Sequence, residues 1–328
     1  MADGAGMGGD TAGASIAWNE GTLGEWDGLF ARVARPTLLQ SFAYGRAMGR
    51  TYGYLPKLGV IRRDGAPIGL VQILERRILK LFWDRQLHRG PLWLDDAIPD
   101  PETLEAVFRR LRKACPHSPL SRASLLPELP PSPENEEMLR RCGFRRHGPG
   151  YRTVWLDLTR NEEALRAGLN RDWRKRLRAA EKADLVLDVD WQAGNLPWLM
   201  KQEHEQAAGK GFRPMTGTLA VRLRNALVKG GGAGDAALMV TALERQTPVA
   251  CILFFRHGAA ATSQVGWASE AGRRSGAMRL VQWRAALALK ERGVRILDLG
   301  GVTDAAPGVT EFKLGTGGQA VETIGQYR

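Results

Sequence analysis

The chain has 328 residues, of which 44% are hydrophobic and 25% charged. These fractions are typical of a folded globular protein, and the length is sufficient for two ordinary domains. No run of about 18 uninterrupted apolar residues occurs, which argues against a membrane-spanning helix. The N-terminus lacks a basic segment followed by an apolar one, so we expect no secretory signal and a cytoplasmic location.

The cysteines and histidines do not form a recognisable ligand pattern. The three cysteines are widely spaced without a C-x-x-C pair, and the five histidines are scattered. A disulfide framework and a metal site are therefore both unexpected, and a reducing compartment fits this usage.

The net charge of +12 is spread along the chain. Residues 1–160 carry 23 basic against 18 acidic side chains, and residues 161–328 carry 24 against 17. A distributed positive excess suits a polyanionic partner such as RNA, a nucleotide diphosphate or anionic lipid head groups. A generally basic, solvated surface accounts for the same numbers.

The first half of the chain predicts a tail followed by alternating helices and strands. Residues 1–15 are rich in Gly and Ala and nearly devoid of large apolar side chains, which predicts a disordered tail. Apolar periodicity then predicts helices over 38–52, 101–113 and 134–141, and strands over 57–62, 68–76, 79–83 and 152–158.

The second half repeats this mixed order. A hairpin is predicted over 236–244 and 248–256, followed by a strand over 261–268, a helix over 276–292 and a buried strand over 294–299. The sequence thus predicts an α/β (α+β) protein with two similar domains, 16–160 and 161–328.

A basic helix is predicted around Asn170. Leu165, Leu169, Trp173 and Leu177 recur every four residues and form one apolar stripe. The opposite face aligns five cations, whose mutual repulsion a bound anion would relieve. This face is either a phosphate-binding surface or a solvated amphipathic face; its cations are Arg171, Arg174, Lys175, Arg178 and Lys182.

The C-terminal part contains glycine-rich segments around an acid and a lysine. The strand ending near Leu299 delivers Asp298, Gly300 and Gly301 to the edge of a sheet, where ligands commonly bind. A loop is predicted over 308–318, in which Gly317 permits close backbone approach. Lys313 lies in this loop and could neutralise an oxyanion during acyl transfer. An ordinary glycine-rich connection fits the same spacing.

Two short signals precede these segments. Gln40, Ser41 and Tyr44 begin a helix that could line a cleft, although Ser41 also fits a simple N-cap. Arg89 lies in a His-Arg-Gly-Pro turn. We expect Gln40, Ser41, Tyr44 and Arg89 to contact substrate, while a structural role accounts for both patterns as well.

Taken in order, these segments resemble the FemABX family over about residues 38–327. Residues 40–44 resemble the opening Gln-Ser followed by an aromatic, and 89–91 resemble the Arg-Gly-Pro turn. Residues 170–182 are similar to the basic helix of the family. The most specific match is Asp-Leu-Gly-Gly at 298–301 followed by the Phe-Lys and Gly-Gly pairs within 308–318.

The resemblance implies two tandem GNAT-like domains, each a mixed central sheet flanked by helices, with a cleft between them. It implies transfer of an amino acid from aminoacyl-tRNA to an amine of a UDP-linked or lipid-linked peptidoglycan precursor, in cell-wall synthesis and the maintenance of cell shape. It allows peripheral contact with the inner membrane surface and requires no metal or organic cofactor. It assigns Lys313, with Phe312, to the reacting carbonyl or the tRNA end.

The chain departs from this family in the first domain. Several members carry Asp-Pro after a strand, whereas this chain has Leu126, Pro127 and Glu128. An acid proposed to assist the attacking amine is therefore absent, and Glu128 could replace it only if the loop is shifted.

Two other functions remain open from the residues alone. An acyl-CoA-dependent N-acyltransferase, using acetyl-CoA or another acyl-CoA, needs a small-residue turn before a helix to cradle pyrophosphate. Residues 273–278 approach this pattern, but Met278 occupies the last small position. A non-catalytic RNA-binding protein would account for the charge but not for the segment around Lys313. The oligomeric state is not indicated by the sequence.

Overall fold

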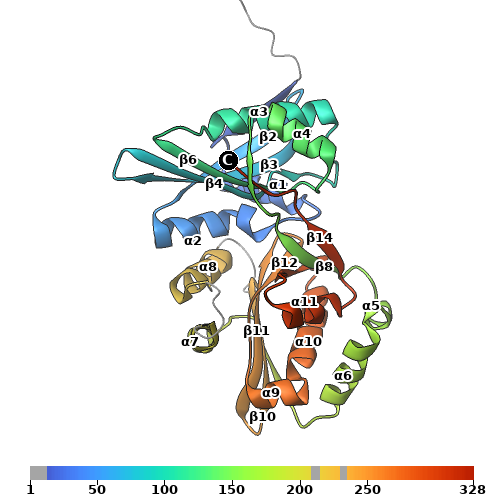
Figure 1. Cartoon of the computed structure of the whole chain (residues 1–328). Coiled ribbons are helices and arrows are strands. Elements are labelled where there is room, and N and C mark those ends of the chain that lie inside the picture. The colour runs from blue at the N-terminus through green and yellow to red at the C-terminus, as the bar shows by residue number, and fades with distance from the viewer. Residues whose placement is uncertain (1–12, 208–214, 230–234) are drawn as a thin grey trace, which may run out of the picture.

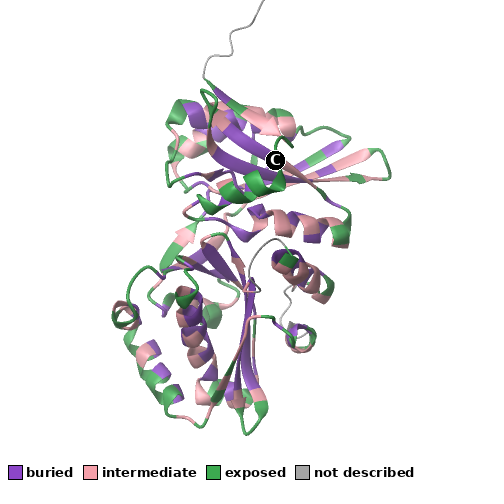
Figure 2. Ribbon diagram, turned by 180° about the vertical axis from the view of Figure 1, so that it is seen from behind, coloured by how far each residue is buried: buried purple, intermediate pink, exposed green. Residues whose placement is uncertain are grey.

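The computed structural model describes residues 13–207, 215–229 and 235–328. It contains two β-sheets, each flanked by helices, in two parts that lie one above the other in Figure 1, with α2 (Phe42–Tyr52) and α8 (Gly217–Lys229) where the two parts meet. Buried residues follow the strands of both sheets and the helix faces against them (Figure 2). The predicted α/β (α+β) fold with two mixed sheets is confirmed.

The first sheet is antiparallel except for one parallel pair, β4 with β6. Both of its faces are apolar and covered: α3 (Pro101–Ala114) and α4 (Pro133–Arg141) pack on one face, and α1 (Leu23–Ala31) with the start of α2 packs on the other. The strand order is β1 (Ala14–Trp18), β2 (Leu55–Arg63), β3 (Ala66–Ile78), β4 (Phe82–Gly90), β6 (Ser121–Pro127), β15 (Gln326–Tyr327) and β7 (Arg146–Gly148), with β5 (Leu92–Trp93) on β3.

The second sheet is opened between two of its strands. β12 and β13 pair in parallel over only three positions, from Ala260 with Ile296 to Thr262 with Asp298, and then separate. The sheet order is β14 (Gln319–Glu322), β8 (Arg152–Asp157), β13 (Ile296–Gly301), β12 (Ala260–Ala268), β11 (Thr247–His257), β10 (Ala237–Glu244) and β9 (Val186–Asp190).

Helices cover both faces of the second sheet. On one face, α6 (Arg171–Glu181) and α10 (Ala277–Glu291) share a core with the strands; α5 (Glu162–Gly168), α9 (Glu270–Ser275) and α11 (Pro307–Leu314) lie near them. On the other, α7 (Leu196–Ala207) and α8 share a core that also includes Ala47 and Met48 of α2. The domains are therefore joined by a common apolar core.

The chain does not pass from the first sheet to the second at the predicted boundary between residues 160 and 161. β8 pairs with β13 and β14, so the second sheet begins before residue 160, and the C-terminal strand β15 returns to the first sheet. Of the expected tail, residues 1–12 lie outside the described residues, while Ala14 and Ser15 pair with β2 in strand β1.

Three predicted elements differ locally. The helix expected over 38–52 is divided into the short 3-10 helix η1 (Leu38–Gln40) and α2, because Ser41 is extended and caps α2. The strand expected over 79–83 is mostly a turn, and β4 begins at Phe82. The loop expected over 308–318 contains α11, so Lys313 lies in the last turn of a helix.

Replacing Ile324 tests the return of the C-terminus to the first sheet. Ile324 is completely buried in the core under α3 and its N–H donates to the Leu129 carbonyl. We expect Ile324→Ala to lower the free energy of unfolding by about 2–5 kcal/mol, measured by urea denaturation. The exposed Ile98→Ala is the control; equal effects of the two substitutions would contradict this packing.

Candidate functional site

A cavity of about 420 Å³ lies where β12 and β13 separate. Lys313 lines this cavity, and so does the N-terminal end of α10. The positive end of the helix dipole there favours a negatively charged ligand. Two buried polar atoms, Arg279 Nε and Gln282 Nε2, have no hydrogen-bond partner among the described residues. Other lining residues are Ile252, Ser263, Gln264, Gly266, Arg273, Gly276, Met278, Leu299, Val309 and Phe312.

Lys313 is held at the mouth of this cavity by the backbone of β13. Its Nζ donates to the Gly301 carbonyl at 2.8 Å. Burial lowers the pKa of Lys313 to about 8, against the opposing influence of the Asp298 carboxylate. The ammonium therefore carries its charge near neutral pH but loses its proton far more readily than an ordinary lysine.

Phe312 anchors α11 to the basic helix. Its carbonyl accepts a hydrogen bond of 3.0 Å from Trp173 Nε1, and the two rings lie 5.9 Å apart. The Arg279 guanidinium lies over both rings, at 6.0 and 5.7 Å from their centroids. The position of Lys313 thus depends on α6 and α10.

Asp298 orders the glycine turn that receives Lys313. Its carboxylate accepts hydrogen bonds from the Thr153 hydroxyl at 2.5 Å and the Gly300 N–H at 2.8 Å. Gly300 has φ of +77°, and a Cβ there would lie 2.9 Å from the Ser263 carbonyl. Only glycine fits this turn without displacing β12.

Arg89 reaches Asp298 from the first domain. Its side chain is almost fully buried and forms a two-pronged ion pair with Glu128, including Nη2 to Oε1 at 2.9 Å. Its Nη1 lies 3.6 Å from Asp298 Oδ2, and its guanidinium stacks 4.5 Å from the Tyr151 ring centroid. Burial opposes the charge most strongly, but the Glu128 and Asp298 carboxylates outweigh it and raise the pKa of Arg89.

Arg89 and Glu128 therefore lie behind the cavity rather than in it. Both carboxylate oxygens of Glu128 accept from Arg89. In this arrangement Glu128 balances a buried cation, and it lines a different hollow, which it shares with Trp155. Arg89 bridges two acids from different domains.

The residues at the start of α2 have local partners. Gln40 is buried, and its amide donates to the Gln72 and His88 carbonyls and accepts from the Gln72 N–H, which ties η1 to β3 and β4. The Ser41 hydroxyl accepts from the Tyr44 N–H as the cap of α2. Burial raises the pKa of Tyr44 to about 12.

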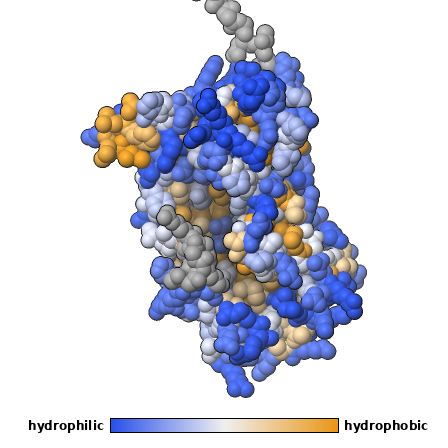
Figure 3. Space-filling view, in the orientation of Figure 1, coloured by the Kyte–Doolittle hydropathy of each residue, from blue (hydrophilic) through white to orange (hydrophobic). Residues whose placement is uncertain are grey.

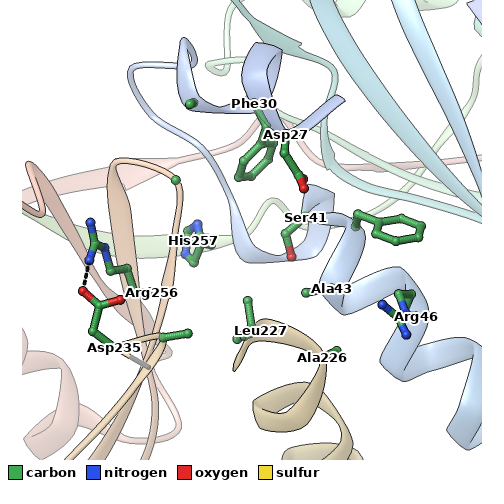
Figure 4. A pocket seen from close by; sticks show the side chains of 14 residues that line it. Asp27, Phe30, Ser41, Ala43, Arg46, Ala226, Leu227, Asp235, Arg256 and His257 are labelled. Carbon is green, nitrogen blue, oxygen red and sulfur yellow. Dashed lines mark hydrogen bonds and ion pairs between the residues drawn. The ribbon is translucent and has the colours of Figure 1, made fainter. Parts of the chain in front are cut away.

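A second hollow, of about 520 Å³, lies between the domains. Asp27 and Ser41 face it from the first domain, and His257 and the Arg256–Asp235 ion pair line it from the second (Figure 4). Burial lowers the pKa of His257 to about 3, so the imidazole is neutral and accepts or donates only as a polar group.

The predicted cations lie together on the outer face of α6. They line a shallow surface groove of about 840 Å³. The helix begins at Arg171, with Asn170 as its N-cap, and Arg174 donates to the Ala167 and Leu169 carbonyls. Lys175 and Arg178 have no ion-pair partner in the described part of the chain. The groove consists of Arg171, Arg174, Lys175, Arg178 and Lys182 with Asp172 and Ala179.

Gly317, predicted to contact substrate, has a packing role in the structure. It has φ of +78°, and a Cβ there would lie 2.2 Å from the Gly168 carbonyl at the end of α5. Its requirement for glycine is explained by packing.

The structure therefore brings Asp298, Gly300, Gly301, Phe312 and Lys313 together, backed by Arg89. Sequence reasoning did not select Tyr151, Arg279 or Gln282. Arg279 follows directly after the 273–278 segment and could have been found as a cation at a helix start. Tyr151 and Gln282 stand in no motif, and their positions depend on tertiary packing.

Comparisons with known proteins agree with this architecture. The acetyltransferase (GNAT) domain family matches residues 167–315. The crystal structure of FemX superposes with a TM-score of 0.76 at 15% identity, over 95% of this chain and 96% of that one. No curated protein sequence matches the chain.

Two further structures share the fold. A tandem GNAT protein from the clavulanic acid biosynthesis pathway has a TM-score of 0.53 at 15% identity, covering 95% of this chain and 98% of that one. A protein of unknown function from Bacteroides thetaiotaomicron has a TM-score of 0.58 at 13% identity, with the same coverage. The chain thus has the FemX-like fold of two GNAT-like domains, as predicted, and the combination supports an acyltransferase.

In the described ranges, no helix is long and apolar enough to cross a membrane. Nor do three or more His, Cys, Asp or Glu side chains gather in these ranges as metal ligands would.

The proton affinity of Lys313 can be measured directly. We expect amine-selective acetylation, followed by mass spectrometry over a pH series, to give a labelling midpoint near pH 8 for Lys313. Asp298→Asn removes the carboxylate that favours the ammonium, so the midpoint should move to lower pH. Exposed Lys201 is the internal reference; a Lys313 midpoint identical to that of Lys201 would refute this site.

Arg89→Met tests the buried ion contacts. The substitution keeps an apolar stem but leaves Glu128 and Asp298 without their cation, so we expect a loss of about 3–5 kcal/mol in the free energy of unfolding. Arg152→Met breaks an exposed pair with Asp304 and should change stability little. Comparable urea midpoints for both variants would show that Arg89 does not hold the domains.

Proposed function

We propose that this chain is an aminoacyltransferase that moves an amino acid from aminoacyl-tRNA to an amine of a peptidoglycan precursor in the cytoplasm. The observation that carries the proposal is Lys313, a half-buried ammonium in the lining of the β12–β13 cavity, within a fold shared with FemX. The cavity supplies a place for the donor end, and the half-buried cation supplies charge where an acyl transfer needs it.

In the proposed reaction the neutral amine of the stem peptide attacks the ester carbon of aminoacyl-tRNA. A C–N bond forms, negative charge develops on the carbonyl oxygen, and the C–O bond to the tRNA ribose breaks. The Lys313 ammonium stabilises the oxyanion, while Phe312 and the glycine turn fix its position. The proton lost by the amine ends on the departing ribose oxygen, carried by water.

Two surfaces suit the large anionic substrates. The cations Lys175 and Arg178 face solvent without carboxylate partners in the described part of the chain, and they can contact the phosphates of tRNA or of the precursor diphosphate. The hollow between Ser41 and His257 carries polar side chains from both domains among apolar ones and can hold the stem peptide (Figure 4). Neither metal nor organic cofactor has a step in this reaction.

An acyl-CoA-dependent N-acyltransferase is the second candidate. The favouring observation is that Arg273 and Gly276 line the same cavity at the N-terminal end of α10, where pyrophosphate would be attracted. Met278 also lines it, at a position where a phosphate-cradling turn needs a small residue. The two candidates differ in the donor and share Lys313.

A donor exchange assay separates the candidates. Purified protein is incubated with UDP-linked or lipid-linked muropeptide and either radiolabelled aminoacyl-tRNA or acetyl-CoA. We expect label on the precursor only from tRNA, abolished by RNase, and a decrease of about 10²–10³-fold in rate for Lys313→Ala, as for loss of an oxyanion donor. Lys201→Ala, an exposed lysine of α7, should keep the wild-type rate.

Transfer from acetyl-CoA alone would refute the tRNA donor and favour the second candidate. Equal rates for Lys313→Ala and the wild type would refute the assigned role of Lys313 with either donor.

A further inference from the structure

The β3–β4 hairpin extends beyond the strands on both sides of it. β2 ends its pairing with β3 at Leu55 and Glu75, so Arg76 to Ile78 have no neighbour on that side. β6 begins opposite Trp83, so the turn over 79–81 also projects past it. The hairpin therefore forms a free tip at one end of the first sheet (Figure 1).

This tip exposes large apolar side chains. Leu79 and Leu81 are 87% and 70% exposed, and Leu120, whose carbonyl accepts from the Trp83 N–H, is 63% exposed beside them. In Figure 3 the same place is a projecting apolar surface bordered by hydrophilic residues. Folded proteins seldom gather exposed leucines on a projection unless another apolar phase covers them.

The backbone of the turn adds to this observation. Leu79 and Lys80 have φ of 49° and 59°, in the left-handed region where Gly or Asn is usually found in a hairpin. A turn that keeps Leu and Lys at such positions retains their side chains at a conformational cost. An outlier of this kind points to a use for the side chains themselves.

Cations surround the apolar tip. Arg77 and Lys80 are exposed and have no ion-pair partner within the residues described. The guanidiniums of Arg77 and Arg85 lie 5.6 and 4.7 Å from the centroid of Trp83, on a ring that is partly exposed. Leucines at a tip with tryptophan and basic side chains behind them match the order of layers at a lipid surface, from acyl chains to anionic head groups.

The hairpin is held rigid at its base. The buried Asp84 carboxylate receives Arg76 at 3.0 Å, Arg122 at 3.2 Å and the Tyr54 hydroxyl at 2.6 Å. The leucines are therefore presented on a fixed support, and little ordering is needed when they are covered.

We propose that the β3–β4 tip is a membrane-docking element that inserts Leu79 and Leu81 into the surface of a bilayer containing anionic phospholipid, with Arg77 and Lys80 on the head groups. A second copy of this chain fits less well, because a symmetric contact would bring the cations of both tips together. The tip also offers only three exposed leucines among the described residues, whereas a stable protein interface uses about 20–30 residues on each side. The proposal does not depend on the proposed acyl transfer.

Vesicle binding tests the docking element. The full chain is sedimented with vesicles of phosphatidylcholine containing 30% phosphatidylglycerol, and with phosphatidylcholine alone. We expect binding to the anionic vesicles, at least tenfold weaker for Leu79→Ser/Leu81→Ser and about fivefold weaker for each of Arg77→Gln and Lys80→Gln. Val186→Ser, 62% exposed on β9 of the other domain, and Lys201→Gln are the matched controls and should bind as the wild type does.

Several results would overturn the proposal. These are absence of wild-type binding to anionic vesicles, unchanged binding of Leu79→Ser/Leu81→Ser, and equal losses in the Val186 control. Light scattering after size exclusion tests for self-association. A wild-type dimer that Leu79→Ser/Leu81→Ser converts to a monomer, together with no vesicle binding, would assign the tip to self-association. Circular dichroism checks that each variant is folded.

Discussion

The contact of Arg89 with Glu128 and Asp298 is the interaction on which the rest of the candidate site depends. A buried guanidinium is costly unless carboxylates surround it, and here one carboxylate comes from each domain. Arg89 therefore fixes the relative position of β4 and β13 as well as a local charge. The shared apolar core of α2, α7 and α8 holds the domains together, but apolar contacts do not fix one relative orientation. The ion contacts of Arg89 fix that orientation.

A chain of hydrogen bonds along β13 connects the Arg89–Asp298 contact to the cavity. Asp298 orients the Gly300 N–H, the turn presents the Gly301 carbonyl, and that carbonyl receives Lys313. Trp173 fixes the other side of α11 through Phe312. The ammonium thus stands between two rigid supports at the opening of β12 and β13, where a reacting carbonyl could be bound, and preorganised charge of this kind is effective in stabilising an oxyanion.

The sequence predicted the repeated mixed α/β order and the residues around Lys313, because strand periodicity and Gly-rich segments are local signals. The helix that contains Lys313 is not predicted by the sequence, because Gly308 lies in its first turn, Gly315 follows its last residue and its apolar stripe is short. The role of Arg89 was out of reach, because its partners lie 39 and 209 positions away in the sequence (Glu128 and Asp298). For the same reason the sequence does not predict that β8 belongs to the second sheet and β15 to the first. Their pairing partners decide this, and both strands are short.

The most direct measurement is the acetylation midpoint of Lys313 in the double variant Arg89→Gln/Glu128→Gln, which removes one buried cation with its acid and leaves Asp298 in place. If the first domain controls the site through Arg89, the negative charge of Asp298 is no longer neutralised, so the ammonium is stabilised and the midpoint rises above the wild-type value near pH 8. A folded double variant with the wild-type midpoint would contradict the coupling of the two domains at Lys313.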